Sequence, residues 1–172
     1  MTESSLTLDG ILSARLQVSD AVVDVEEPVV KLVIFTLDED WFAFPGDKIR
    51  EILGDSPVYF LPGCPPSLEG VINLRGDIES VLRLRSVLGH GEAPAAAASA
   101  ILLGQASSMR SGLRVDRVED VVDVPQSSLQ PPIHTIPDNL RPIVLGVLTF
   151  RDHLVTVLDL ARIFDDYRQG LR

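Results

Sequence analysis

The stretch GVINLRGDIESVLRLRSVLG, which runs from Gly70 to Gly89, decides how the rest of the chain is interpreted. Its apolar residues at 71–74 and 78–82 are separated by a sharp break, and this pattern predicts a β-hairpin with Arg75 at its tip beside Gly76. The residues that follow predict a short helical turn. The stretch therefore places an arginine at the exposed corner of an otherwise apolar hairpin.

Composition and net charge limit the classes of protein to which this chain can belong. The chain has 172 residues, of which 45% are hydrophobic, enough for one domain with a core or for two small subdomains that share one. The formal net charge of −10 argues against sequence-independent binding of nucleic acid and against anionic membrane surfaces. The start MTESSLTLDG lacks the basic region of a signal peptide, and no uncharged apolar run approaches the roughly 18 residues that cross a bilayer. We expect a cytoplasmic protein with no direct membrane insertion.

The chain divides into an arm and a folded domain. Residues 1–28 are rich in acidic groups and are expected to form a loosely ordered N-terminal arm, and residues 29–172 are expected to form the domain. Within it, the alanine-rich segment at about 89–100 is expected to be a surface linker. The segment 47–53 fits a short strand or a helical turn. Asp159 is expected to cap a terminal amphipathic helix.

An internal repeat indicates two copies of one β unit. Shifting the chain by 76 positions aligns GVLTFR at 146–151 with GVINLR at 70–75, and a second echo at another offset sets RVEDVV at 117–122 beside KIREIL at 48–53. Short strands with regularly spaced turns predict small β-barrels, each closed by a short helix. Neither copy is large enough to bury a core alone, so we expect the two to share one.

Side chains that could support catalysis or bind a metal are scattered along the chain. The three histidines are far apart in loop-like sequence without the spacing of metal ligands, and we interpret them as surface residues. Cys64 is interpreted as a small residue in a tight loop, and acidic pairs such as Asp38 and Asp40 as solvated turns. No glycine-rich phosphate-binding motif is present. We therefore expect no enzymatic activity, no metal site and no bound cofactor.

Arg75 leaves two interpretations open. It is either an ordinary turn residue that pairs with Asp77, or a docking residue whose planar guanidinium contacts a carboxylate or carbonyl of a partner. In the segment 48–53, charged residues alternate with Ile49 and Ile52. One edge of this segment is expected to offer mixed charge while the isoleucines pack inward.

Four motifs, in order, resemble the CheW-like domain family. LPGCPPSLEGVINLRGDI resembles the family's proline-rich approach followed by G-V-I-N-L-R-G, and GLRVDRV at 112–118 resembles its second signature, G-L-V-V-D-x-V. WFAFPGDKIREIL is similar to the family's first-strand pattern, and the closing VLDLARIF also fits. The resemblance covers residues 31–164, almost everything except the arm.

The resemblance implies a mainly β fold of two tandem, intertwined five-stranded SH3-like β-barrels that share a core, with short helices that include a C-terminal one. It also implies a non-enzymatic protein that links the cytoplasmic tip of a chemoreceptor to the regulatory domain of a histidine kinase. The family's receptor-contact arginine falls on Arg75, and two neighbouring receptor-binding positions fall on Ile49 and Glu51. Asn73 and Gly76 match the motif and are expected to fix the turn.

The chain departs from the family pattern at two positions of the first hairpin. The family usually has proline and aspartate where this sequence has Ser80 and Arg83, whereas Asp159 is kept at the position equivalent to Arg83 in the second repeat. A helix that lacks its capping carboxylate loses about 1 kcal/mol. We therefore expect partner preferences that differ from those of a standard adaptor.

The leading hypothesis is an adaptor in a bacterial chemosensory array, for chemotaxis or for a parallel pathway such as twitching motility. One surface would pair with the homologous regulatory domain of the kinase, and the corner at Arg75 would contact the receptor, so that the protein is recruited to membrane-associated arrays. The alternative hypothesis is a small-ligand-binding regulatory β-barrel domain. That function requires a concave pocket with converging polar groups, and the sequence identifies none.

Overall fold

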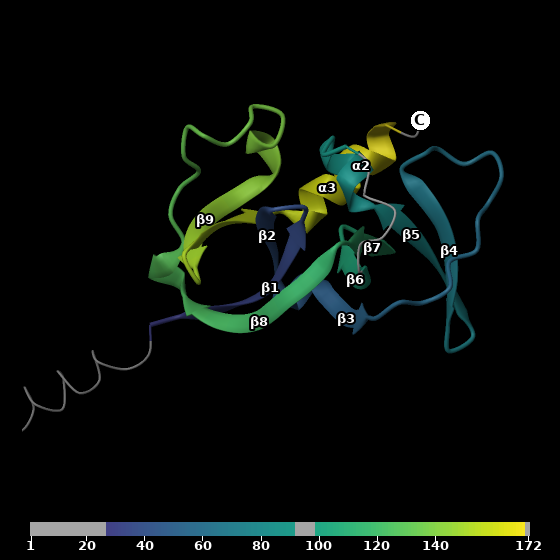
Figure 1. The fold of residues 1–172 in the computed structure, drawn as a ribbon, viewed down its shortest axis with the longest axis horizontal. Helices are drawn as coiled ribbons and strands as arrows, with labels where there is room; N and C mark the ends of the chain where they lie inside the picture. The colour runs from purple at the N-terminus through teal and green to yellow at the C-terminus, as the bar shows by residue number, and fades with distance from the viewer. Residues whose placement is uncertain (1–26, 92–98, 171–172) are drawn as a thin grey trace, which may run out of the picture.

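The computed structural model describes residues 27–91 and 99–170 (Figure 1). Most of the expected arm at 1–28, and residues 92–98 of the expected linker, lie outside the described residues. In the described part the fold is mainly β. The strands are β1 (Val29–Leu37), β2 (Asp40–Pro45), β3 (Ile49–Leu53), β4 (Leu68–Leu74), β5 (Asp77–Arg83), β6 (Ala100–Ala106), β7 (Met109–Val115), β8 (Arg117–Pro125), β9 (Val144–Phe150) and β10 (His153–Leu158).

Two α-helices and three 3₁₀ turns complete the described fold. Helix α2 (Leu84–Leu88) follows the β4–β5 hairpin, and α3 (Leu160–Gly170) follows the β9–β10 hairpin. The 3₁₀ turns are η1 (Gly46–Lys48), η2 (Gln126–Ser128) and η3 (Arg141–Ile143). The segment predicted as a strand or a helical turn is therefore both, since η1 leads directly into β3.

The strands form two five-stranded sheets with the same topology. Barrel A has the order β8-β1-β2-β10-β9, and barrel B has the order β3-β6-β7-β5-β4. Each barrel contains one parallel pair, β2 with β10 in barrel A and β7 with β5 in barrel B. The predicted fold class, two intertwined five-stranded barrels with short helices, is confirmed.

The two sequence repeats exchange strands. The first repeat supplies β1 to β5 and the second supplies β6 to β10, yet each barrel combines the first hairpin of one repeat with the last three strands of the other. Because neither barrel comes from a single continuous segment, neither repeat can complete a barrel without the other. The pseudo-symmetry pairs β3 with β8, β4 with β9 and β5 with β10, so equivalent positions of the two barrels can be compared.

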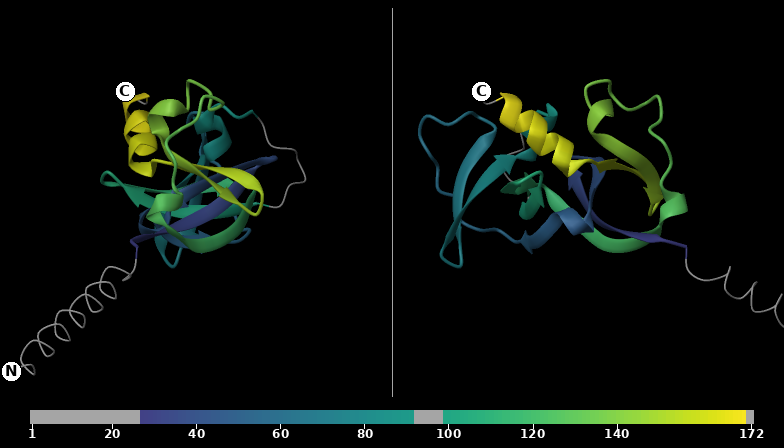
Figure 2. Two further views of the ribbon diagram at one scale, coloured as in Figure 1. Left: turned by 90° about the vertical axis from the view of Figure 1, so that its left-hand side faces the viewer. Right: turned by 180° about the vertical axis from the view of Figure 1, so that it is seen from behind.

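One hydrophobic core joins the two barrels. Phe35 and Phe44 of barrel A stack with ring centroids 5.1 Å apart, and they share a buried cluster with Leu82 and Leu113 of barrel B. Helix α3 adds its buried residues to the same cluster, and Figure 2 shows it lying across the junction of the barrels. The prediction that two small units share a core is therefore confirmed.

A close backbone contact requires glycine at the start of the repeated G-V motif, at Gly70 and Gly146. A Cβ on Gly70 would lie 2.2 Å from the carbonyl oxygen of Tyr59, and a Cβ on Gly146 would lie 2.8 Å from that of Gln130. In each barrel, the loop that precedes the hairpin forms an isolated β-bridge with the valine that follows the glycine. Tyr59 pairs with Val71, and Gln130 pairs with Val147. The bridges cover the outer edges of β4 and β9, which would otherwise present unpaired backbone groups.

The two short helices differ at their N-termini, as the sequence departures predict. Asp159 precedes α3, and its Oδ1 accepts a hydrogen bond from the Arg162 N–H at 3.2 Å. Arg83 occupies the equivalent position before α2 and makes no capping hydrogen bond. Instead, Arg83 Nη1 donates to the carbonyl of Pro66 at 2.6 Å, which ties the β3–β4 loop to the end of β5.

Candidate functional site

The tip of the β4–β5 hairpin is a tight two-residue turn. Arg75 and Gly76 have φ values of 52° and 92°, the left-handed combination that suits the right-handed twist of the flanking strands. The Gly76 N–H donates to Asn73 Oδ1 at 2.9 Å and closes the turn from inside. The backbone of Arg75 is therefore held by the hairpin on both sides, and its side chain projects from a rigid corner.

The guanidinium of Arg75 pairs with Glu51, a partner that neither interpretation of the sequence anticipated. Nη2 donates to both carboxylate oxygens at 2.5 Å, and Nη1 lies 3.3 Å from Oε2. The Arg75 side chain remains 65% exposed and that of Glu51 35% exposed. The interpretation that paired Arg75 with Asp77 names the wrong carboxylate. The docking interpretation must also be refined, since a partner meets an ion pair rather than a free cation.

The ion pair bridges the open seam of barrel B. Glu51 lies on β3 and Arg75 follows β4, and these strands form the two edges of the sheet. Hydrogen bonding to Arg75 lowers the pKa of Glu51 below its ordinary value, and the same bond raises the pKa of Arg75. Both groups therefore stay charged. In the described part of the chain, the Nε–H of Arg75 donates to no acceptor, so the pair can still bind a further carboxylate.

The third predicted receptor residue, Ile49, is oriented differently from Glu51. A register shift between Ile49 and Glu51 interrupts the pairing of β3 with β6, and Ile49 packs against the shared core. The next isoleucine departs from the expectation. Ile52, which was expected to pack inward, is exposed beside Glu51. Ile78, just beyond the turn, is also exposed, and sequence alternation did not single it out.

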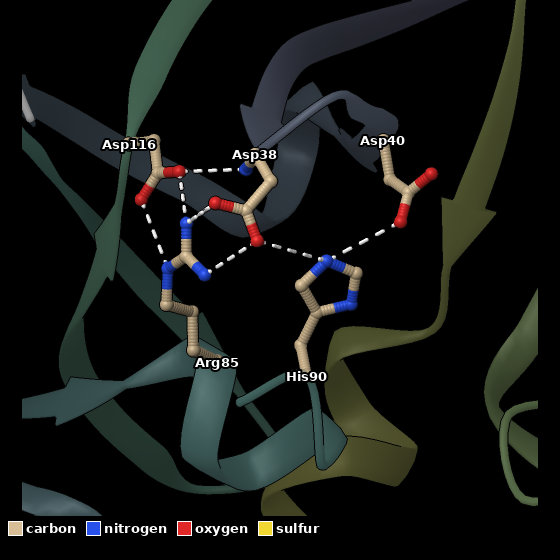
Figure 3. A network of polar contacts seen from close by, with 5 residues as sticks. All are labelled: Asp38, Asp40, Arg85, His90 and Asp116. Atoms are coloured by element: carbon tan, nitrogen blue, oxygen red, sulfur yellow. Dashed lines mark hydrogen bonds and ion pairs between the residues drawn. The ribbon is translucent and has the colours of Figure 1, made fainter. Parts of the chain in front are cut away.

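A second polar cluster joins the two barrels, and the sequence did not predict it (Figure 3). Arg85 of α2 is buried, and its Nη1 and Nη2 donate to Asp38 of the β1–β2 turn at 2.8 Å and 2.7 Å. The same guanidinium donates to Asp116, which connects β7 to β8, with an Nε–Oδ1 distance of 3.1 Å. Asp116 Oδ2 in turn accepts the N–H of Asp38 at 2.6 Å. The cluster therefore ties α2 of barrel B to the first turn of barrel A.

The electrostatics of this cluster favour the charged forms. Hydrogen bonding to Arg85 lowers the pKa of Asp38, and the two carboxylates raise the pKa of Arg85. Charge-assisted hydrogen bonds of this kind are stronger than neutral ones, most of all where they are shielded from water. Asp38 lies in an exposed turn, as the sequence predicts, and it is also one end of an interbarrel ion pair.

Two of the three histidines make specific side-chain contacts, and of these His153 is an exposed surface residue, as the sequence predicts, whereas His90 is not. His90 is largely buried, with Nε2 3.3 Å from Asp40 Oδ2, and its ring meets Phe42 edge-on. His153 stacks on Trp41 with ring centroids 4.1 Å apart. Among the described residues, no group of three or more His, Cys, Asp or Glu side chains is placed to hold a metal ion.

A cavity of about 440 Å³ lies where α2 and α3 meet the loop before β9. Its walls are mostly apolar, with Val87, Leu140 and Ile163 among them, and its Ser67 and Tyr167 hydroxyls lie 3.0 Å apart. In the residues that the structure describes, every buried side-chain polar atom has a hydrogen-bond partner. The polar side chains of Ser86, Asn139 and Asp166 also line the cavity.

Comparison with known proteins identifies the family. The family model for the CheW-like domain matches residues 31–168, most of the chain. The chain belongs to the CheW-like domain family. The family's G-V-I-N-L-R-G motif thus corresponds here to the β4–β5 hairpin and its arginine corner.

Related proteins from several bacteria agree with this assignment. The chain is 28% identical over 148 residues to a probable chemotaxis protein CheW of Rhizobium etli, which covers 86% of this chain and 96% of the relative. It is 29% identical over 134 residues to the chemotaxis protein CheW of Rhizobium meliloti, covering 78% and 86%. The crystal structure of a scaffolding protein, TtCheW from Thermoanaerobacter tengcongensis, superposes with a TM-score of 0.70 at 27% identity, covering 82% of this chain and 91% of that one.

Family membership settles the broad class of function. CheW-like proteins act as scaffolds or adaptors in chemotaxis and are not enzymes, so the prediction of a non-enzymatic adaptor is confirmed at this level. In the two described stretches, no helix has the length and hydropathy to cross a membrane.

Proposed function

We propose that this protein couples the cytoplasmic tip of a chemoreceptor to a CheA-like histidine kinase, and that Arg75 and Glu51 form the receptor contact. The observation that carries the proposal is the exposed Arg75–Glu51 pair, held at a rigid corner by the hairpin turn. A receptor carboxylate would bind the donors of Arg75 that Glu51 leaves free, or would displace Glu51. Ile49 packs against the shared core and holds β3 in place, and the exposed part of its side chain contributes to the receptor contact.

The kinase is assigned to a different surface of barrel B. Residues Tyr59 to Leu61, in the loop between β3 and β4, are all exposed, and Phe60 is 73% exposed. A cluster of large apolar side chains without a covering element is typical of a protein–protein interface. The kinase regulatory domain would pack on this cluster, barrel against barrel. The adaptor is then recruited from the cytoplasm to receptor arrays by two separate contacts, and multivalency strengthens each.

Pairwise binding separates the two contacts. Purified protein is titrated with a receptor-tip fragment and, separately, with the kinase regulatory domain. Arg75→Glu should lose the receptor fragment and keep the kinase, because it reverses the charge at the corner and leaves the apolar loop intact. Phe60→Asp should do the opposite.

Arg162→Glu is the matched control, because Arg162 is an exposed, ion-paired arginine on α3. It should bind both partners as the wild type does. If Arg75→Glu binds the receptor fragment as tightly as Arg162→Glu, the receptor contact is elsewhere.

A further inference from the structure

A second ion pair repeats the Arg75–Glu51 pair on the other barrel. Arg151, at the tip of the β9–β10 hairpin, donates through Nη2 to Asp120 Oδ2 of β8 at 2.6 Å. Arg151 lies 76 positions after Arg75 and Asp120 lies 69 positions after Glu51, which are the two offsets of the internal repeat. The side chains of the second pair are 58% and 34% exposed, close to the values of the first. Since β8 and β9 are the edges of barrel A, this pair also bridges an open seam.

The aliphatic neighbours of the two pairs correspond as well. In each, an exposed aliphatic residue directly follows the carboxylate, and another lies three positions after the arginine. The same four chemical types therefore recur at the same four places. The first corner consists of Glu51, Ile52, Arg75 and Ile78, and the second corner consists of Asp120, Val121, Arg151 and Leu154.

The turn that carries Arg151 is unfavourable for its backbone. Arg151 and Asp152 have φ values of 48° and 64°, a left-handed conformation that glycine, asparagine and aspartate tolerate better than arginine does. The guanidinium also lies over the ring of Phe150, 4.8 Å from its centroid. Arginine thus stands where glycine would fit the turn better, which indicates that its side chain has a role.

The pair with Asp120 leaves N–H donors of the Arg151 guanidinium available for a further hydrogen bond. In the described part of the chain, only Nη2 has a protein acceptor, and a guanidinium carries five N–H donors in a planar fork that fits a carboxylate. The exposed Val121 and Leu154 supply apolar contact area beside it. A complementary partner presents a carboxylate next to aliphatic side chains.

We propose that the second corner is a second docking site for the same class of partner as the first, an α-helical segment that presents a carboxylate beside aliphatic side chains. The inference rests on the proposed function, which assigns a receptor tip to the first corner. The β4–β5 and β9–β10 hairpins lie at opposite ends of the molecule (Figures 1 and 2). One adaptor therefore holds two receptor tips apart and crosslinks them, in addition to binding the kinase.

The stoichiometry of receptor-tip binding tests the proposal. Isothermal titration of the full chain with the receptor-tip fragment should give two fragments per wild-type chain. Arg151→Glu and Arg75→Glu should each reduce the number to one, and the double variant to none. If the wild type binds one fragment, Arg75→Glu abolishes binding and Arg151→Glu changes nothing, the second site is refuted and the proposed function stands. If Arg75→Glu leaves the stoichiometry unchanged, the proposed function fails.

A second variant keeps the test independent of the ion pair. Leu154→Gln leaves Arg151 and Asp120 in place and should also reduce the stoichiometry to one. Leu145→Gln is the matched control, since Leu145 is an exposed leucine near the start of β9, at the other end of the strand from Arg151. It should retain two sites. Equal stoichiometry for the two glutamine variants overturns the proposal.

Discussion

Replacing Arg85 by methionine tests whether the buried guanidinium joins the two barrels. Methionine keeps much of the apolar stem but removes all the hydrogen bonds to Asp38 and Asp116. The Arg85 side chain is only 7% exposed and that of Asp116 17% exposed, so the substitution leaves a largely buried carboxylate without its cation. Removing one partner of a buried ion pair destabilises a protein by about 3–5 kcal/mol.

The lower end of that range applies here. Asp38 is 42% exposed and can be solvated once Arg85 is gone, and Asp116 keeps the hydrogen bond from the Asp38 N–H. We therefore expect a loss of about 3 kcal/mol in the free energy of unfolding. For a chain of this size, such a loss lowers Tm by about 6–12 °C. Urea titration followed by the fluorescence of the single Trp41, together with calorimetry, measures both values.

The matched control is Arg162→Met on α3. Arg162 pairs with Asp166 at 3.3 Å on the exposed face of the helix, and such pairs contribute about 0.5 kcal/mol or less. If Arg85→Met unfolds with the same free energy as Arg162→Met, the cluster does not hold the barrels together and the reasoning from burial is wrong.

Two further predictions concern the same architecture. Because Arg85 lowers the pKa of Asp38, the carboxylate stabilises the fold fully above its unfolded value of about 3.9, and this contribution disappears as the pH falls through the lower folded value. The difference in unfolding free energy between wild type and Asp38→Asn should therefore be constant from pH 5 to 7 and shrink as the pH falls below about 4; a difference that does not shrink on acidification contradicts the pairing. Gly70→Ala should destabilise the protein by about 1–3 kcal/mol in urea titrations, because its Cβ would overlap the Tyr59 carbonyl. Gly54→Ala, which meets nothing within 4 Å, should be close to neutral, and equal effects would exclude the steric explanation.

Local sequence patterns predict the hairpins, the terminal helix and the shared core. Alternation marks the strands around Arg75, and Asp159 marks the start of α3 because a capping carboxylate acts within one turn. The repeat indicates two equivalent units. It does not reveal that the units exchange hairpins, because β1 and β2 have a pattern that suits either barrel. Packing in the core decides which barrel the β1–β2 hairpin joins, because Phe35 and Phe44 pack there with residues from the other half of the chain.

Side-chain partners across long separations are outside the reach of sequence patterns. Arg75 pairs with Glu51 through the curvature of barrel B, and the nearer Asp77 is an equally reasonable partner until that curvature is known. Burial along β3 alternates from residue to residue, with Arg50 and Ile52 exposed, so Ile49 and Ile52, three positions apart, do not both pack inward. No sequence pattern indicates that Arg85 is buried, since a charged residue on a short helix usually faces water.

Recruitment of the kinase to receptors tests the central claim most directly. Receptor-tip fragments assembled on vesicles are sedimented with the kinase and this protein, and the kinase in the pellet is measured. We predict that the wild-type adaptor brings the kinase into the pellet, whereas Arg75→Glu leaves it in the supernatant. Circular dichroism and the separate kinase titration check that this variant is folded and binds the kinase. Equal amounts of kinase in the pellet with wild type and Arg75→Glu would contradict the assignment of the arginine corner to the receptor.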